Sequence, residues 1–119
     1  MNEKKVLIVD DDATNRKLLN IILKKKNINT IEAENGSDAL NKLSPEVSLV
    51  LLDIFMPVMN GIEFMKSIRT IKPEFSNIPI IVLSTDETQK NETLSWGATD
   101  FIQKPVNPVN LLEKISKYL

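Results

Sequence analysis

Histidine and cysteine are both missing from this sequence of 119 residues. Without cysteine, the chain has no disulfide, no thiolate metal site and no cysteine nucleophile. Without histidine, it also lacks the usual general base, the usual zinc ligand and the Ser-His-Asp triad. Any chemistry must therefore use carboxylates, hydroxyls, lysine, arginine and the backbone.

A large excess of one charge and a long apolar run are missing as well. The 15 basic and 16 acidic residues leave a net charge of −1, so no overall field attracts nucleic acid or an acidic membrane. The apolar run after Lys5 is too short for a signal peptide or a membrane span. We therefore expect a single cytoplasmic domain over residues 1–119, with no direct binding to nucleic acid or to a membrane.

Short apolar runs alternate with segments of helical spacing along the chain. The runs predict strands at 6–9, 29–33, 49–52, 79–83 and 99–103. Helical spacing predicts helices at 13–26, 37–43, 61–72, 88–96 and from residue 107 onward. In these helices we expect the core to contain Leu18, Leu19, Ile22, Leu23, Ala39, Leu40, Leu43, Gly61, Phe64, Met65, Ile68, Val109, Leu112, Ile115 and Leu119.

Strands that alternate with helices predict an α/β fold, a doubly wound five-stranded parallel sheet with helices on both faces. Right-handed crossovers allow few topologies, and the common order for a chain of this size is 2-1-3-4-5, the flavodoxin-like (βα)5 arrangement. In this order the first and third strands are neighbours at the switch point of the sheet. Open parallel sheets bind ligands there, outside the carboxyl ends of their strands.

Polar side chains follow four of the five predicted strands. They are Asp10 and Asp11 after the first strand, Asp53 after the third, Ser84 and Thr85 after the fourth, and Lys104 after the fifth. Two like charges about 4 Å apart repel by roughly 4 kcal/mol at an effective dielectric near 20, so three carboxylates at one edge need a cation. Carboxylates are hard oxygen ligands, which favour Mg²⁺, with Mn²⁺ as an alternative.

The same edge has groups that suit a phosphoryl group. Lys104 provides a fixed positive charge and Ser84 a hydroxyl, both of which bind phosphoryl oxygens. A carboxylate nucleophile is a known route to an acyl phosphate. The pattern therefore predicts a site that places a phosphoryl group on a carboxylate while metal, lysine and hydroxyl neutralise its oxygens. Asp12 or Thr14 can cap the following helix, and Asp12 is expected to serve as a cap rather than bind the metal.

With these residues, essentially the whole chain resembles the receiver domain of two-component response regulators, such as the chemotaxis response regulator. The resemblance rests on Val9-Asp10-Asp11, Asp53 followed by Met56-Pro57 and Gly61, Ser84-Thr85, Gly97-Ala98 and Lys104-Pro105.

The resemblance implies a role for each acidic residue of the site. Asp53 is expected to be the phosphoacceptor, and Asp10 and Asp11 the acidic pair that holds Mg²⁺ together with Asp53 and the backbone carbonyl of Phe55. Phe55 occupies a position that helps set the hydrolysis rate in this family. A bulky apolar group there would shield the acyl phosphate from water, so we expect slow self-dephosphorylation.

The resemblance also implies how the signal enters and leaves. Lys104 is expected to bind the phosphate, Ser84 to be the switch hydroxyl and Phe101 the switch aromatic. The phosphoryl group is expected from a sensor histidine kinase or a histidine phosphotransfer protein. The face formed by the fourth helix, fifth strand and fifth helix then signals to a downstream effector. Such a domain is not an enzyme, although it assists its own phosphotransfer and slow dephosphorylation.

Two alternatives remain open at this point. The run from Asp10 to Thr14 also resembles the nucleophile motif of haloacid-dehalogenase-like phosphatases, with Asp10 as nucleophile and Asp12 as acid/base. Asn15, where an apolar residue is usual, and the short chain argue against it. The other alternative is a pseudo-receiver, a binding module that is never phosphorylated; the complete site argues against that. A stand-alone regulator, a phosphorelay intermediate and the receiver part of a longer protein all fit the sequence.

Overall fold

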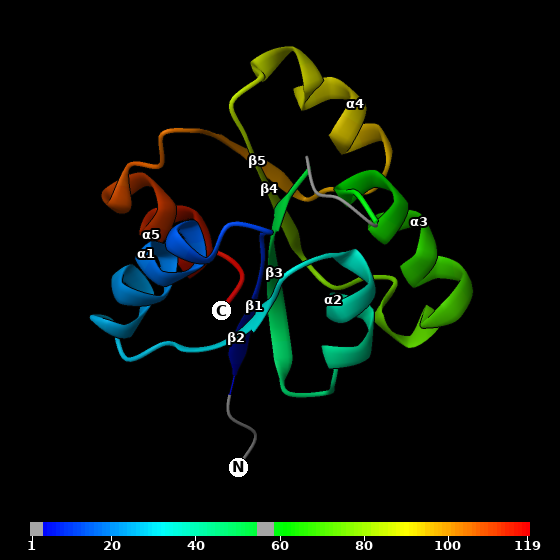
Figure 1. The fold of residues 1–119 in the computed structure, drawn as a ribbon, viewed down its shortest axis with the longest axis horizontal. Coiled ribbons are helices and arrows are strands. Elements are labelled where there is room, and N and C mark those ends of the chain that lie inside the picture. Colours follow the sequence, from blue (N-terminus) through cyan, green and yellow to red (C-terminus); the bar gives the residue numbers. More distant parts are fainter. Residues whose placement is uncertain (1–3, 55–58) are drawn as a thin grey trace.

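A five-stranded parallel sheet forms the centre of the computed structural model, which describes residues 4–54 and 59–119 (Figure 1). The spatial order is β2-β1-β3-β4-β5, which confirms the predicted fold class and strand order. The strands are β1 (Lys5–Val9), β2 (Asn29–Ala33), β3 (Val47–Asp53), β4 (Ile80–Ser84) and β5 (Asp100–Gln103). The helices are α1 (Ala13–Lys24), α2 (Gly36–Lys42), α3 (Gly61–Ile71), α4 (Lys90–Ser95) and α5 (Pro108–Ser116).

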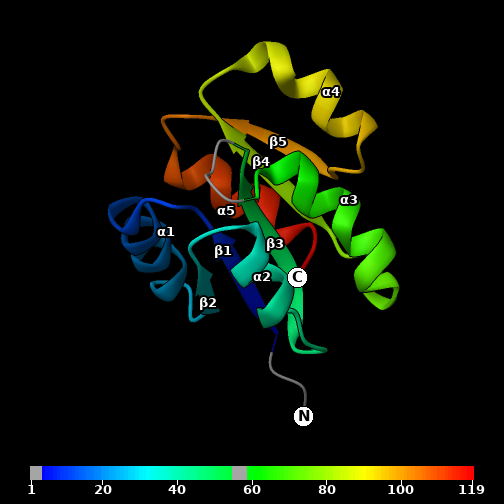
Figure 2. The same ribbon diagram turned by 45° about the vertical axis from the view of Figure 1, so that its right-hand side comes forward.

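Helices cover both faces of the sheet. In Figures 1 and 2, α1 and α5 lie on one face, and α2, α3 and α4 lie on the other. Side chains alternate between the faces along each strand, so β1 and β3 contribute to two separate apolar clusters. Because the central strands are buried on both faces, they appear in the sequence as unbroken apolar runs. Within the described residues, no helix has both the length and the apolar character that crossing a membrane requires.

The expected inner face of α1 is partly wrong. Leu19, Ile22 and Leu23 are buried as predicted, but 55% of Leu18 is exposed. Adjacent helix residues lie about 100° apart around the axis. Because Leu19 faces the sheet, Leu18 lies on the side of the helix that is partly exposed to solvent. The helix also ends at Lys24, two residues before the predicted end.

The expected inner face of α5 is wrong at Val109, which is 65% exposed, and it omitted Leu111, which is buried together with Ile115. Leu112 on the helix and Leu119 beyond its end are partly buried and pack against the same apolar cluster. Both stripes have helical spacing, and the sequence pattern favoured the one that begins at Val109.

The segment before β5 is also divided differently from the prediction. Instead of one helix over 88–96, a 3₁₀ turn, η2 (Glu87–Gln89), precedes α4; a second such turn, η1 (Pro73–Phe75), follows α3. The side chain of Asp86 accepts a hydrogen bond from the amide of Thr88 and begins the turn. Gly97, with φ of 110°, follows the end of the helix in a conformation that favours glycine.

Candidate functional site

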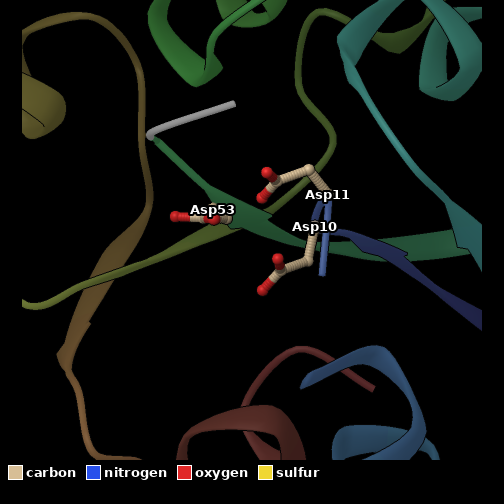
Figure 3. Close-up of side chains that lie close together, drawn as sticks. All are labelled: Asp10, Asp11 and Asp53. Carbon is tan, nitrogen blue, oxygen red and sulfur yellow. The ribbon is translucent and has the colours of Figure 1, made fainter. Parts of the chain in front are cut away.

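Three carboxylates meet at the carboxyl ends of β1 and β3. Val9 is in register with Leu52, so the residues that end or follow these strands lie side by side. Oxygens of Asp10, Asp11 and Asp53 all lie within 4.8 Å of one another, and the close-up shows the carboxylates around a common space (Figure 3). Asp10 and Asp53 are buried, whereas Asp11 is exposed.

Lys104 brings a positive charge to this cluster. Its Nζ lies 3.5 Å from Asp10 Oδ2 and 3.8 Å from Asp53 Oδ1. The lysine reaches the cluster because its amide donates to the carbonyl of Ser84 at 2.8 Å, which continues the pairing of β4 with β5 by one residue. The following peptide bond, to Pro105, is cis. Among the residues that the structure describes, the ion pairs of Lys104 place one ammonium group beside three carboxylates, so negative charge is in excess there.

The surroundings of Asp10 test whether a metal ion fits here. Its Oδ1 accepts a hydrogen bond from the amide of Asp12 at 2.9 Å. Its Oδ2 is buried and is paired with Lys104 Nζ at 3.5 Å, but it has no hydrogen-bond partner among the described residues. A buried carboxylate oxygen without a hydrogen bond is unfavourable, and three hard oxygen donors match the preferences of a small divalent cation. The residues of the site therefore fit a divalent metal ion.

Ser84 lies at the same edge of the sheet. It is the last residue of β4, directly after Leu83, which is in register with Asp53. The side chain is buried, and its Oγ accepts a hydrogen bond from the amide of Asp86 at 3.1 Å. Ser84 thus lies at the same edge of the sheet as the carboxylate cluster, and its hydroxyl contacts the start of the segment that leads to α4.

Phe101 lies further from the edge, in the middle of the β4–β5 pairing. It is in register with Val82, and its ring is buried in the apolar cluster beneath α2 and α3. The side chain is only 6% exposed. The expected switch aromatic therefore already occupies an inward position in this structure.

Two other expectations concern the loops around the cluster. Asp12 is the N-cap residue of α1, and its carboxylate accepts a hydrogen bond from the amide of Thr14 at 2.8 Å, which confirms the predicted cap. The phosphatase alternative needs this carboxylate as acid/base, although it is engaged in the cap. Phe55, with its expected carbonyl ligand, and the Met56-Pro57 motif lie outside the described residues.

Sequence reasoning missed one residue that contacts the site. Arg16, in the first turn of α1, donates a hydrogen bond from Nη1 to the backbone carbonyl of Asp10 at 2.6 Å. No spacing rule indicates a bond from a helix side chain to a carbonyl beyond a strand. The only hint in the sequence was an arginine one helical turn after Asp12.

Comparison with known proteins identifies the family. The family model described as the response regulator receiver domain matches residues 6–116 of this sequence. The chain is 38% identical over 117 residues to the transcriptional regulatory protein CpxR homolog of Haemophilus influenzae, covering 97% of this chain and 50% of that protein. It is 37% identical over 121 residues to the transcriptional regulatory protein ResD of Bacillus subtilis, covering 99% of this chain and 49% of that protein. The chain thus spans about half the length of these relatives.

Solved structures share the fold along nearly the whole of this chain. The chemotaxis response regulator CheY4 of Vibrio cholerae superposes with a TM-score of 0.88 at 32% identity, covering 98% of this chain and 99% of that one. The response regulator TrrA of Thermotoga maritima, in complex with Mg²⁺ and BeF, gives 0.85 at 36% identity, covering 98% and 99%. Since the family model, the relatives and the fold agree, the chain belongs to the response regulator receiver domains, signalling modules of two-component systems whose family function is to accept a phosphoryl group.

Proposed function

We propose that residues 1–119 act as one receiver domain in which Asp53 is the phosphoacceptor. The observation that carries the proposal is the position of Lys104, whose Nζ lies 3.8 Å from the Asp53 carboxylate and 3.5 Å from Asp10. The acceptor is thus flanked by a cation and by a second acid at the switch point of the sheet, where parallel α/β folds bind their ligands. Asp10 as acceptor, which the phosphatase alternative requires, is disfavoured by the family and by the capping role of Asp12.

In this proposal the donor is a phosphohistidine that lies outside these 119 residues, since they contain no histidine. A carboxylate oxygen of Asp53 attacks the phosphorus while the phosphorus–nitrogen bond breaks, and the imidazole nitrogen leaves with the bonding electrons and takes a proton from solvent. A sensor histidine kinase or a histidine phosphotransfer protein has the required group. In self-dephosphorylation, water attacks the same phosphorus while the bond between phosphorus and the Asp53 oxygen breaks, which releases inorganic phosphate and returns Asp53 to a carboxylate.

The other charged groups of the site bind the metal ion and the phosphoryl oxygens during this transfer. Asp10, Asp11 and Asp53, with the backbone carbonyl of Phe55, would hold Mg²⁺, or Mn²⁺ in its place. Bound there, the ion offsets the charge of the carboxylates and of the phosphoryl oxygens. Lys104 turns its ammonium group from the carboxylates to a phosphoryl oxygen, a contact that lysine makes as a point charge.

Ser84 connects the phosphoryl group to the output. Its hydroxyl exchanges the hydrogen bond from the Asp86 amide for one to the phosphate, which moves the start of the segment toward α4. The phosphoryl group thereby shifts a two-state equilibrium toward the state in which Phe101 points inward. Phe101 is buried in this structure as well. The α4-β5-α5 face then binds a downstream effector.

Phe55 shields the acyl phosphate, so that self-dephosphorylation is slow. We place this chemistry in the cytoplasm, without direct contact to nucleic acid.

The test is phosphorylation by a small donor. The protein is incubated with Mg²⁺ and acetyl phosphate, and its intact mass is measured beside Asp53→Asn, Asp10→Asn and a sample without Mg²⁺. We expect the parent to gain the mass of one phosphoryl group and Asp53→Asn to gain none. Circular dichroism verifies that each variant is folded.

Other outcomes would contradict the proposal in distinguishable ways. A gain that persists in Asp53→Asn and disappears in Asp10→Asn would assign the acceptor to Asp10, as in the phosphatase alternative. No gain in a folded parent, with acetyl phosphate and with a panel of phosphorylated histidine phosphotransfer proteins, would indicate a pseudo-receiver.

A further inference from the structure

The loop of residues 10–12, which carries two of the three clustered acids, is held by several hydrogen bonds. Beyond the hydrogen bond from the Asp12 amide to its side chain, Asp10 donates its own amide to the carbonyl of Ala33 on β2 at 3.1 Å. Its carbonyl accepts the 2.6 Å hydrogen bond from Arg16 Nη1. These contacts hold the backbone of Asp10 in place where β1 has ended.

Arg16 binds this loop from two directions at once. Its amide donates to the carbonyl of Asp12 at 3.1 Å as part of the first turn of α1, and its guanidinium binds the carbonyl of Asp10. Nε of the same guanidinium donates to Glu32 Oε1 at 3.2 Å, and Glu32 lies on β2 in register with Ile8. The side chain is only 16% exposed. The arginine therefore connects the loop, the helix and the edge strand through hydrogen bonds.

The clustered carboxylates repel one another, and Asp11 is the exposed member that is free to turn into solvent. A loop that is free to relax would separate them in the absence of metal and would have to be ordered again when a cation binds. A loop held by Arg16 keeps its backbone in the position from which the carboxylate oxygens reach within 4.8 Å of one another. Groups that orient metal ligands through such contacts typically contribute about 10- to 100-fold to metal affinity.

We propose that Arg16 is a positioning residue for the acidic cluster, which holds the backbone of Asp10 and thereby raises the affinity of the site for Mg²⁺. This inference rests on the proposed function of the site. The predicted change in Mg²⁺ affinity on removal of Arg16 is opposite to the change that its charge alone would cause. Removal of a nearby positive charge by itself strengthens cation binding, whereas loss of the positioning contact weakens it.

The experiment compares Mg²⁺ binding by titration calorimetry, without phosphodonor, in the parent, Arg16→Gln, Arg16→Lys and Lys17→Gln. Lys17 is the matched control because it is exposed on the same helix and its substitution removes the same charge. We expect Arg16→Gln to bind Mg²⁺ about 10-fold more weakly. Arg16→Lys, which keeps the charge and one donor, should recover part of the loss, and Lys17→Gln should bind as tightly as the parent or slightly more tightly.

A second measurement reports on the metal-free loop. Amide hydrogen exchange at Asp10 and Asp12 should be faster in Arg16→Gln than in the parent, with exchange in β3 and β4 unchanged. Phosphorylation by acetyl phosphate should need more Mg²⁺ in this variant but approach the parent rate at saturation. If Arg16→Gln does not fold, the Mg²⁺ affinities of Arg16→Lys and Lys17→Gln are compared instead. Weaker binding by Arg16→Lys supports the inference, and equal binding overturns it.

Two results overturn the inference. One is Mg²⁺ binding that is equal or tighter in folded Arg16→Gln, and the other is a parent that binds no Mg²⁺. Failure of the proposed function looks different, since Mg²⁺ would then bind in an Arg16-dependent way while Asp53 takes up no phosphoryl group.

Discussion

Lys66 on α3 holds its ammonium group over the ring of Trp96, 3.9 Å from the ring centroid. Trp96 is the C-cap residue of α4, and its partly buried ring packs against the apolar cluster beneath α2 and α3. Within α4 itself, Thr93 is the residue that is fully buried. The contact between Lys66 and Trp96 therefore joins α3 to a helix with little buried surface of its own, the kind of element that opens locally at low free energy.

Substitution of Lys66 by glutamine should loosen α4 and leave the sheet unchanged. A cation–π contact at a partly exposed site is worth about 0.5–1 kcal/mol, so the free energy of unfolding should fall by no more than that. Amides of α4 should exchange faster with deuterated solvent. Lys17→Gln, the same charge change on α1, serves as the control. Equal exchange in α4 of Lys66→Gln and the control would show that the contact does not restrain the helix.

Substitution of Asp11 by asparagine should have opposite effects with and without metal. The variant removes one of three charges whose oxygens lie within 4.8 Å, so the metal-free protein should gain about 1 kcal/mol of unfolding free energy, a value reduced for the exposure of Asp11. Mg²⁺ binds the folded state and raises the melting temperature of the parent. It should raise that of the variant less.

Asp12→Asn is the matched control for Asp11→Asn. Asparagine caps helices about as well as aspartate, so this change removes a neighbouring charge and keeps the cap. Thermal unfolding of both variants and the parent, with and without Mg²⁺, measures the two effects. A metal-free Asp11→Asn protein that melts at or below the temperature of the parent would contradict the repulsion argument.

Much of the fold and of the acidic cluster was predictable from the sequence because both follow from local rules. The run Val6–Val9 is apolar without interruption because β1 is buried on both faces, and few other positions in a fold produce so short and unbroken a run. Asp10, Asp53 and Lys104 meet because parallel strands end at the same edge. That conclusion needed only the strand order, and 2-1-3-4-5 is the common one.

Other features depend on how the elements are placed on one another. Whether α5 buries Leu111 or Leu112 depends on the rotation of the helix on the sheet, and both choices have helical spacing. The hydrogen bond from Arg16 to the carbonyl of Asp10 depends on the distance between α1 and the end of β1. No rule based on residue spacing contains these quantities, so the sequence pattern could not predict them.

Acid should remove the stabilising effect of the ion pair between Asp100 on β5 and Lys114 on α5, whose charged atoms lie 3.0 Å apart. Burial raises the pKa of Asp100, but the hydrogen bonds from Lys114 and the Phe101 amide, with the charges of Lys114 and Lys117, outweigh it and lower the pKa below its ordinary value. A carboxyl group with a lowered pKa stabilises the fold above its unfolded pKa of about 3.9. This contribution is lost as the pH falls through the lower, folded pKa.

Asp100→Asn measures this contribution. Near neutral pH the variant should unfold with about 0.5–1 kcal/mol less free energy than the parent, as is typical of partly exposed pairs. The difference should be constant down to about pH 5 and should shrink below about pH 4. Urea denaturation of both proteins across this range measures it. A difference that persists unchanged at the acid end would mean that the asparagine acts through packing and not through lost charge.

Gly61 allows α3 to begin directly against the end of β3. Its amide donates to the carbonyl of Ile54 at 2.9 Å, and Asn60 and Glu63 complete the start of the helix with reciprocal cap hydrogen bonds. A Cβ atom at position 61 would lie 2.9 Å from the Cα of Ile54 and 3.1 Å from the carbonyl oxygen of Asp53. Both neighbours are backbone atoms, so a side chain here must displace the segment that carries the expected acceptor.

Gly61→Ala should therefore weaken both the fold and the site. Alanine favours helix formation over glycine by up to about 1 kcal/mol, so any net loss of stability must come from the backbone contact. We expect the free energy of unfolding to fall by about 1–3 kcal/mol, the usual range for overpacking, and Mg²⁺ affinity to fall with it because Asp53 moves relative to Asp10. Urea denaturation and titration calorimetry measure the two quantities, with Thr70→Ala on the exposed side of α3 as the control. An alanine variant as stable as the parent, with unchanged Mg²⁺ affinity, would show that α3 shifts without moving Asp53.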